Sequence, residues 1–97
     1  MKKKTSPPVS KVDFFDFKYD LERAVLASTQ ENAQQCLTRA KFLCYLLCRN
    51  LSHEHVEMFN ETFSSAEMAV SSTANKKEKT RKFRNNFSRL KHSLYNE

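Results

Sequence analysis

The sequence predicts an all-α protein, a small antiparallel bundle of about four helices with a flexible basic arm at its amino terminus. Three observations lead to this fold class. Apolar residues recur at spacings of three and four along four segments, the period of one face of an α-helix. Helix-capping residues stand before three of these segments. The chain of 97 residues also contains no glycine, although average usage of about 7% would supply about seven.

The absence of glycine excludes several classes of fold and site. Glycine is the usual residue at the positive-φ positions of tight hairpins, P-loops and Rossmann turns. The composition therefore favours helices over β-meanders and over phosphate-cradling loops. A chain of this length buries roughly 60–70% of its unfolded surface and supports one modest core. We expect one helical domain over residues 11–97, preceded by the flexible basic arm at residues 1–10, where lysines accompany two prolines.

The first two helices are predicted from caps and apolar spacing. Ser10 followed by Asp13 indicates an N-cap with an acidic third position, and the helix after it runs to about Ala27. Ser28 and Glu31 resemble a capping box that starts a second helix, which ends near Asn50. The expected core faces are Phe14, Phe17, Leu21 and Ala24 in the first helix, and Ala33, Leu37, Ala40, Cys44, Leu47 and Leu51 in the second.

The third and fourth helices follow in the same way. Ser52 is the expected cap of the third helix, and the segment "SSTAN" at 71–75 separates it from the fourth, a basic amphipathic helix over 76–95. The expected core faces are Val56, Phe59, Phe63, Ala66 and Val70, then Phe83, Phe87, Leu90 and Leu94. Short links favour antiparallel packing, as a bundle or as two stacked hairpins. The aromatic residues of these faces are interpreted as core, whereas Phe15 and Tyr19 lie off the main face and are candidates for surface contact.

The second helix differs because "KFLCYLLC" is apolar around most of its circumference. Two explanations stay open: the helix is central in the bundle, or another copy of the chain covers part of it. The second explanation predicts a homodimer. The longest uninterrupted apolar run, Phe42 to Cys48, has seven residues, whereas a membrane-spanning helix needs about 20. We therefore expect no membrane partner.

The charges divide into three blocks. Residues 1–11 carry four lysines and no acidic residue, residues 12–75 carry five basic and nine acidic side chains, and residues 76–97 carry eight basic and two acidic side chains. The formal net charge of +6 therefore understates how basic both ends are. Such clustering predicts a partner with many negative charges.

On a helical wheel, the apolar face of the 76–95 helix spans an arc of roughly 60°. Lys77, Arg81, Arg84, Ser88 and Lys91 form a second face beside it, and Lys82 and Arg89 lie on the other flank. The candidate nucleic-acid-binding residues are Lys77, Arg81, Lys82, Arg84, Arg89 and Lys91. Three interpretations stay open: a solvated face, a face for nucleic-acid phosphates, and a face for an acidic protein. Glu54, Glu57 and Glu61 fall almost opposite the apolar face of the third helix, so they should point away from the fourth.

The cysteines and histidines do not form a typical metal or catalytic motif. Cys44 and Cys48 are four residues apart rather than in a Cys-x2-Cys knuckle, and His53 and His55 follow an expected helix break. We therefore expect buried thiols, no metal and no cofactor. Candidate nucleophiles have a histidine only as a neighbour in sequence, so we expect no catalytic residues and no enzyme activity. An odd number of cysteines, three, and no apolar signal segment predict reduced thiols and a cytoplasmic protein.

These observations lead to two main functional hypotheses, beside a third in which the protein is a structural subunit that has no separate ligand and assembles beyond a dimer. The first is a non-enzymatic helical regulator that binds DNA or RNA through the 76–95 helix and the amino-terminal arm. A helix-turn-helix reader is disfavoured because the expected sharp turn with glycine is missing. The second is an adaptor or inhibitor that acts on another protein through the apolar surface of the second helix and the charged faces.

Overall fold

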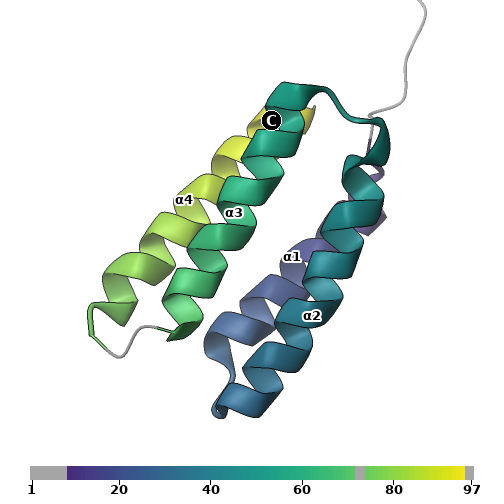
Figure 1. Ribbon diagram of the computed structural model, residues 1–97. Coiled ribbons are helices and arrows are strands. Elements are labelled where there is room, and N and C mark those ends of the chain that lie inside the picture. The colour runs from purple at the N-terminus through teal and green to yellow at the C-terminus, as the bar shows by residue number, and fades with distance from the viewer. Residues whose placement is uncertain (1–8, 72–73, 96–97) are drawn as a thin grey trace, which may run out of the picture.

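The structure, a computed structural model, describes residues 9–71 and 74–95, and all regular secondary structure in this part of the chain is helical (Figure 1). The α-helices are α1 (Lys11–Leu26), α2 (Gln30–Leu47), α3 (His53–Ser71) and α4 (Lys76–Tyr95), and a 3-10 turn, Cys48–Asn50, follows α2. Four α-helices and no strand occur in the described ranges, which confirms the all-α class. The Cα radius of gyration is 13.9 Å, close to the ~12.5 Å expected for a compact domain of this length.

Local hydrogen bonds explain where the helices begin. The Ser10 Oγ accepts from the Asp13 backbone N–H at 3.1 Å, and the Ser52 Oγ accepts from the His55 N–H at 3.3 Å, so both predicted caps are confirmed. The predicted start of the second helix is wrong by one residue. Thr29, not Ser28, is the N-cap of α2, because its extended backbone lets Oγ1 accept from the Asn32 N–H at 3.2 Å.

Asn75 immediately precedes α4 and has a positive φ of 61°. Asparagine tolerates this left-handed conformation better than most residues, which allows a sharp entry into α4 in a chain without glycine. The Asn75 carbonyl accepts from the Lys79 N–H at 3.0 Å and so begins the helical hydrogen-bond series. Within the predicted interruption at 71–75, Ser71 is the last residue of α3, and residues 72–73 lie outside the described residues.

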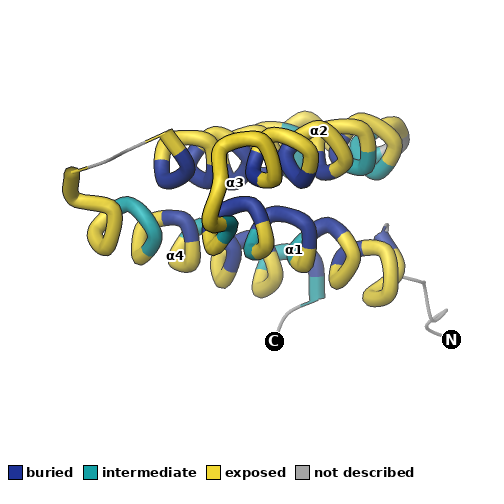
Figure 2. Tube along the Cα trace, turned by 90° about the horizontal axis from the view of Figure 1, so that it is seen from below, coloured by how far each residue is buried: buried dark blue, intermediate teal, exposed yellow. Residues whose placement is uncertain are grey.

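The helices form two layers, with α2 and α3 in one and α1 and α4 in the other (Figure 2). The most extensive packing joins α1 to α2 and α3 to α4, the pairs that are connected by short links. The two pairs then meet mainly through α1 and α3. Although α1 and α4 lie in the same layer, they contact each other mainly through their side chains.

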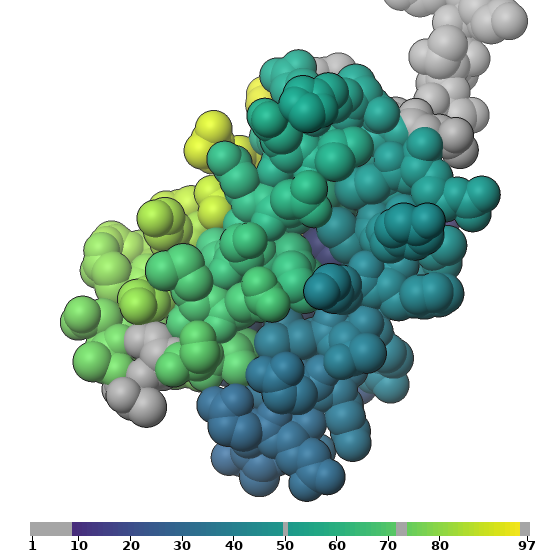
Figure 3. Space-filling model, viewed as in Figure 1, coloured from purple at the N-terminus to yellow at the C-terminus, as the bar shows by residue number. Residues whose placement is uncertain are grey.

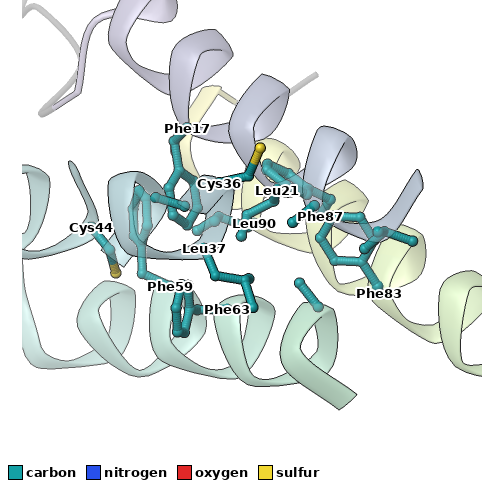
Figure 4. Close-up of a cluster of buried hydrophobic side chains, with 14 of the residues drawn as sticks. Phe17, Leu21, Cys36, Leu37, Cys44, Phe59, Phe63, Phe83, Phe87 and Leu90 are labelled. Atoms are coloured by element: carbon teal, nitrogen blue, oxygen red, sulfur yellow. The ribbon is translucent and has the colours of Figure 1, made fainter. Parts of the chain in front are cut away.

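Phenylalanines from three helices occupy the centre of the core. Phe17 and Phe59 are fully buried, and Phe14 and Phe87 are each 5% exposed. The ring centroids of Phe17 lie 5.2 Å from Phe59 and 5.8 Å from Phe87, and those of Phe14 lie 6.4 and 5.3 Å from the same two rings. These distances are typical of favourable aromatic pairs. Figure 4 shows Phe17, Phe59 and Phe87 within the cluster of buried side chains.

Polar contacts join α1 to α2 and the start of α1 to the end of α4. Asp20 is buried in α1, and its carboxylate accepts from the Arg39 guanidinium of α2 at 3.4 Å. The Tyr95 hydroxyl donates to the Val9 carbonyl at 2.8 Å, and Val9 itself is only 3% exposed. Val9 was expected to belong to the basic arm but is part of the core. Residues 1–8 of the predicted arm lie outside the described residues.

Of the two explanations for the apolar circumference of α2, the central position is wrong. Phe42 is 64% exposed and Tyr45 is 71% exposed. Residues on the opposite side of α2, including Ala33, Leu37 and Ala40, fill its buried face. Figure 3 shows the α2 and α3 face, on which a small area of α1 is visible between the two helices. The homodimer through α2 stays a prediction.

The aromatic core leads to a stability prediction. Phe59→Ala should lower the free energy of unfolding by about 3–5 kcal/mol, because it removes a fully buried ring and leaves a cavity. Phe42→Ala, at an exposed site on α2, should change it by no more than about 0.5 kcal/mol. Urea denaturation followed by circular dichroism measures both. Equal effects of the two substitutions would contradict this description of the core.

Candidate nucleic-acid interface

All six candidate residues of α4 have exposed side chains, but the structure distributes them between two grooves. Arg84 and Lys91 line a groove between α1 and α4, here called the α1–α4 groove. Arg81, Lys82 and Arg89 line a second groove between α3 and α4, the α3–α4 groove. Lys77 is exposed near the start of α4. The structure therefore divides the candidates differently from the helical wheel, because Arg81 lies with Lys82 and Arg89 instead of with Arg84 and Lys91.

The α1–α4 groove has a volume of about 460 Å³. Its lining residues are Lys11, Phe14, Phe15, Lys18 and Glu22 from α1, and Arg84, Phe87, Ser88, Lys91 and Tyr95 from α4. Four of these side chains are cationic and one is a carboxylate, so the lining carries a surplus of positive charge. Cations stand on both walls, and aromatic rings lie between them.

The aromatic core produces this groove. Phe14 of α1 contacts Phe87 and Tyr95 of α4 through rings whose centroids are 5.3 and 5.6 Å away. These long side chains span the distance between α1 and α4 and leave the space above them open to solvent. The Lys11 ammonium lies 5.4 Å from the centroid of the Tyr95 ring, a cation–π distance. This contact holds one wall cation against the opposite helix.

The α3–α4 groove is larger, about 830 Å³, but its charges are more balanced. Its four cations face two carboxylates, Glu61 and Glu78. Glu78 accepts from the Arg81 guanidinium at 2.9 Å, and both side chains are about 70% exposed. Such an exposed pair contributes only about 0.2–1 kcal/mol to stability, so Arg81 can exchange this partner for another anion.

The carboxylates of α3 behave only partly as expected. Glu54 and Glu57 are exposed, and Glu57 pairs with His53 of its own helix at 3.1 Å. Glu61 does not point away from α4 as predicted, because it lines the α3–α4 groove. A groove between two packed helices is open to flanking residues of both, which a wheel drawn for one helix does not reveal. Within the described residues, the structure records no ion pair for Lys77, Lys82, Arg84 or Arg89.

The contribution of α1 to this surface was not predicted. Lys11 belongs to the first charge block, residues 1–11, and neither it nor Lys18 was assigned to a site. The two lysines are seven residues apart, which is two turns of helix, so they lie on one face of α1. Phe15, expected to be a surface aromatic, is 62% exposed and lines the groove. The spacing of Lys11 and Lys18 indicates that they share a face of α1, but only the position of α1 beside α4 shows that this face lines a groove.

The thiols and histidines have separate environments. The Cys44 Sγ donates to the Asn60 Oδ1 at 4.0 Å, and burial raises the pKa of the Cys44 thiol to about 12, with a smaller contribution from Cys48. Burial also raises the pKa of Cys48. His55 hydrogen-bonds with Ser93 through Nε2 at 2.9 Å and with Ser52 through Nδ1 at 3.4 Å. The recorded hydrogen bonds of His55 thus join it to serines and not to a thiol.

Neither a metal cluster nor a membrane span is found in the ranges 9–71 and 74–95. In these ranges, His, Cys, Asp and Glu side chains form no group of three or more that is able to hold a metal ion. The helices there are also too polar or too short to cross a membrane.

Comparison with known proteins gives no relative for this chain. No protein-family model matches the sequence, and neither the curated proteins nor the solved structures contain a match. The geometry and charge of the surface are therefore the basis for any functional assignment.

The raised pKa of Cys44 predicts resistance to alkylation. At pH 8 a thiol with a pKa of about 12 is ionised in only about one molecule in 10,000. Iodoacetamide should therefore leave Cys44 unmodified in the native protein and modify it readily in guanidinium chloride at the same pH, as measured by peptide mass spectrometry. The pKa of Cys44 in the folded state exceeds its ordinary value of 9.0. The free energy of unfolding that Cys44 contributes is therefore fully present below pH 9 and is lost between about pH 9 and 12. Equal labelling rates in the native and denatured states would refute this assignment.

Proposed function

We propose that this protein is a non-enzymatic helical regulator that binds nucleic acid through α4, with the α1–α4 groove as the principal contact and residues 1–10 as a basic extension. In this proposal, the four helices pack as an antiparallel bundle. The observation that carries it is the charge of the groove, where Lys11 and Lys18 of α1 stand opposite Arg84 and Lys91 of α4, and Glu22 is the one carboxylate that the described residues contribute to the lining.

This arrangement suits a polyanion for simple electrostatic reasons. Each lysine or arginine that meets a phosphate releases a condensed counterion, which makes binding favourable at low salt. On each wall the two cations are seven residues apart, about 10.5 Å along the helix axis. Arg84 can also make bidentate contacts with phosphate oxygens. The groove therefore offers two parallel rows of positive charge to an extended phosphate backbone.

The position of the amino terminus supports a role for the arm. Val9 and Ser10 accept hydrogen bonds from the Tyr95 hydroxyl, at 2.8 and 3.3 Å, beside the end of the α1–α4 groove. Lys4 is five residues before Val9, so covalent geometry limits the distance between them to about 18 Å. The lysines at positions 2–4 thus add positive charge within reach of the groove.

The alternative is an adaptor or inhibitor that binds another protein. The exposure of Phe42, Tyr45 and Leu46 on α2 favours this alternative, because clustered exposed apolar side chains often mark contact surfaces. The α2 face lies apart from the two grooves of α4, and its own exposed cations, Arg39, Lys41 and Arg49, belong to α2 and to the turn after it. A partner that binds there would be insensitive to the charges of α4, which separates the two hypotheses experimentally.

Two charge reversals on the same helix test the proposal. The double variants Arg84→Glu with Lys91→Glu, and Arg81→Glu with Arg89→Glu, lower the formal net charge from +6 to +2 alike. The first pair should weaken binding of a labelled 20-nucleotide strand or duplex at least tenfold, and the second pair less, because only the first removes cations from the α1–α4 groove. Fluorescence anisotropy at 50 mM salt measures this difference.

The wild-type protein also makes a quantitative prediction about salt. Four cation–phosphate contacts predict that log K falls with log salt at a slope of about −3 to −4. Thermal unfolding of both double variants serves as the control for intact folding. If neither oligonucleotide shows salt-dependent binding, the proposed function is refuted. If the two double variants lose affinity equally, the α1–α4 groove is not the principal contact.

A further inference from the structure

We propose that the α1–α4 groove selects single-stranded over duplex nucleic acid, with bases stacked on Phe15 and Tyr19 of α1. This inference rests on the proposed function and specifies its ligand. It follows from three features: the concave shape of the groove, the exposed Phe15 ring in its lining with the exposed Tyr19 ring one helical turn further along α1, and the cations near these rings.

The shape of the groove suits a strand better than a duplex. Its volume of about 460 Å³ lies in the range of small-molecule pockets, so it holds roughly one or two nucleotides. Proteins that read a duplex usually insert a protruding helix or ribbon into a DNA groove about 12 Å wide. Here the cations line a hollow instead of a ridge, and the rigid width of a duplex would keep most of its phosphates away from both walls.

Exposed aromatic rings supply a stacking surface. Phe15 is 62% exposed and lines the groove, and Tyr19 is 52% exposed one helical turn further along α1. Four residues of helix correspond to a rise of about 6 Å, which allows successive unstacked bases to reach the two rings. Stacking on aromatic side chains accepts every base, because each base has a π face. A duplex keeps its bases stacked inside and cannot use these rings.

Cations stand close to both rings. The Arg23 guanidinium lies 5.4 Å from the centroid of the Tyr19 ring, and Lys18 lines the groove with Phe15. Bases on the rings would leave the sugar-phosphate backbone near these cations and near Arg84 across the groove. Among the residues that the structure describes, Glu22 is the single carboxylate of the lining. This combination of aromatic rings and basic walls is typical of proteins that bind single strands without strong sequence preference.

The same face of α1 also exposes Val12 and Leu26, at 71% and 72%. A partner helix packing on α1 would use these aliphatic side chains as well as the aromatic ones. A nucleic-acid strand instead requires flat rings at positions 15 and 19. The two occupants therefore predict opposite responses when Phe15 is changed to an apolar residue that is not aromatic.

The test uses the full-length chain with a labelled 12-nucleotide DNA strand and the corresponding duplex, at 50 mM salt. The wild-type protein should bind the strand at least tenfold more tightly than the duplex. Phe15→Leu should weaken binding of the strand about fivefold or more and leave duplex binding unchanged. Phe15→Trp should retain affinity, and because the chain has no other tryptophan, the strand should quench its fluorescence. Phe42→Leu, at a similarly exposed site on α2, should behave as wild type.

The outcomes separate this inference from the proposed function. If the strand and duplex bind equally and Phe15→Leu has no effect, the stacking surface is refuted and the phosphate-binding function remains. If Val12→Ala or Leu26→Ala weakens binding of the strand as much as Phe15→Leu does, this face of α1 makes general apolar contacts, and the inference of base stacking also fails. If neither oligonucleotide binds, both proposals fall together.

Discussion

The contact of Phe14 and Phe17 with Phe59 and Phe87 is the interaction on which the rest of this structure depends. These four rings connect α1 of the first helix pair to α3 and α4 of the second, and α1 and α3 provide the main packing between the two pairs. The rings also set the separation of α1 and α4. Smaller side chains would allow these helices to approach one another and would close the groove between them. The core therefore determines both the stability of the fold and the shape of its most basic surface.

Charge then distinguishes the two grooves that border α4. The α3–α4 groove is larger, yet Glu61 and Glu78 face its cations and Glu78 already pairs with Arg81. In the described part of the chain, the lining of the α1–α4 groove has four cations and one carboxylate, Glu22. A surplus of one sign in a concave surface concentrates the electrostatic potential. The number of cations on α4 is thus less informative than which neighbouring helix each of them faces.

The sequence predicted the helices well because their signals are local. The serine caps at 10 and 52 and the spacing of the four phenylalanine-rich or leucine-rich faces depend on residues within one or two turns. The neighbours of each helix depend on the whole fold, and here prediction was weaker. A wheel placed Glu61 away from α4, assigned no role to Lys18 and allowed a central position for α2. The N-cap of α2 was predicted at Ser28 but lies at Thr29. Both residue types are suitable caps, so only the backbone conformation distinguishes them.

The most direct test of the central claim is a map of the bound surface. Amide chemical shifts of the isotope-labelled protein, recorded while a 12-nucleotide single strand is added, report which residues meet the ligand. If the strand binds in the α1–α4 groove, the largest chemical-shift changes should lie on α1 around Phe15 and Lys18 and on α4 around Arg84 and Lys91. Changes confined to α2, or to the α3–α4 groove around Glu61 and Arg89, would contradict it.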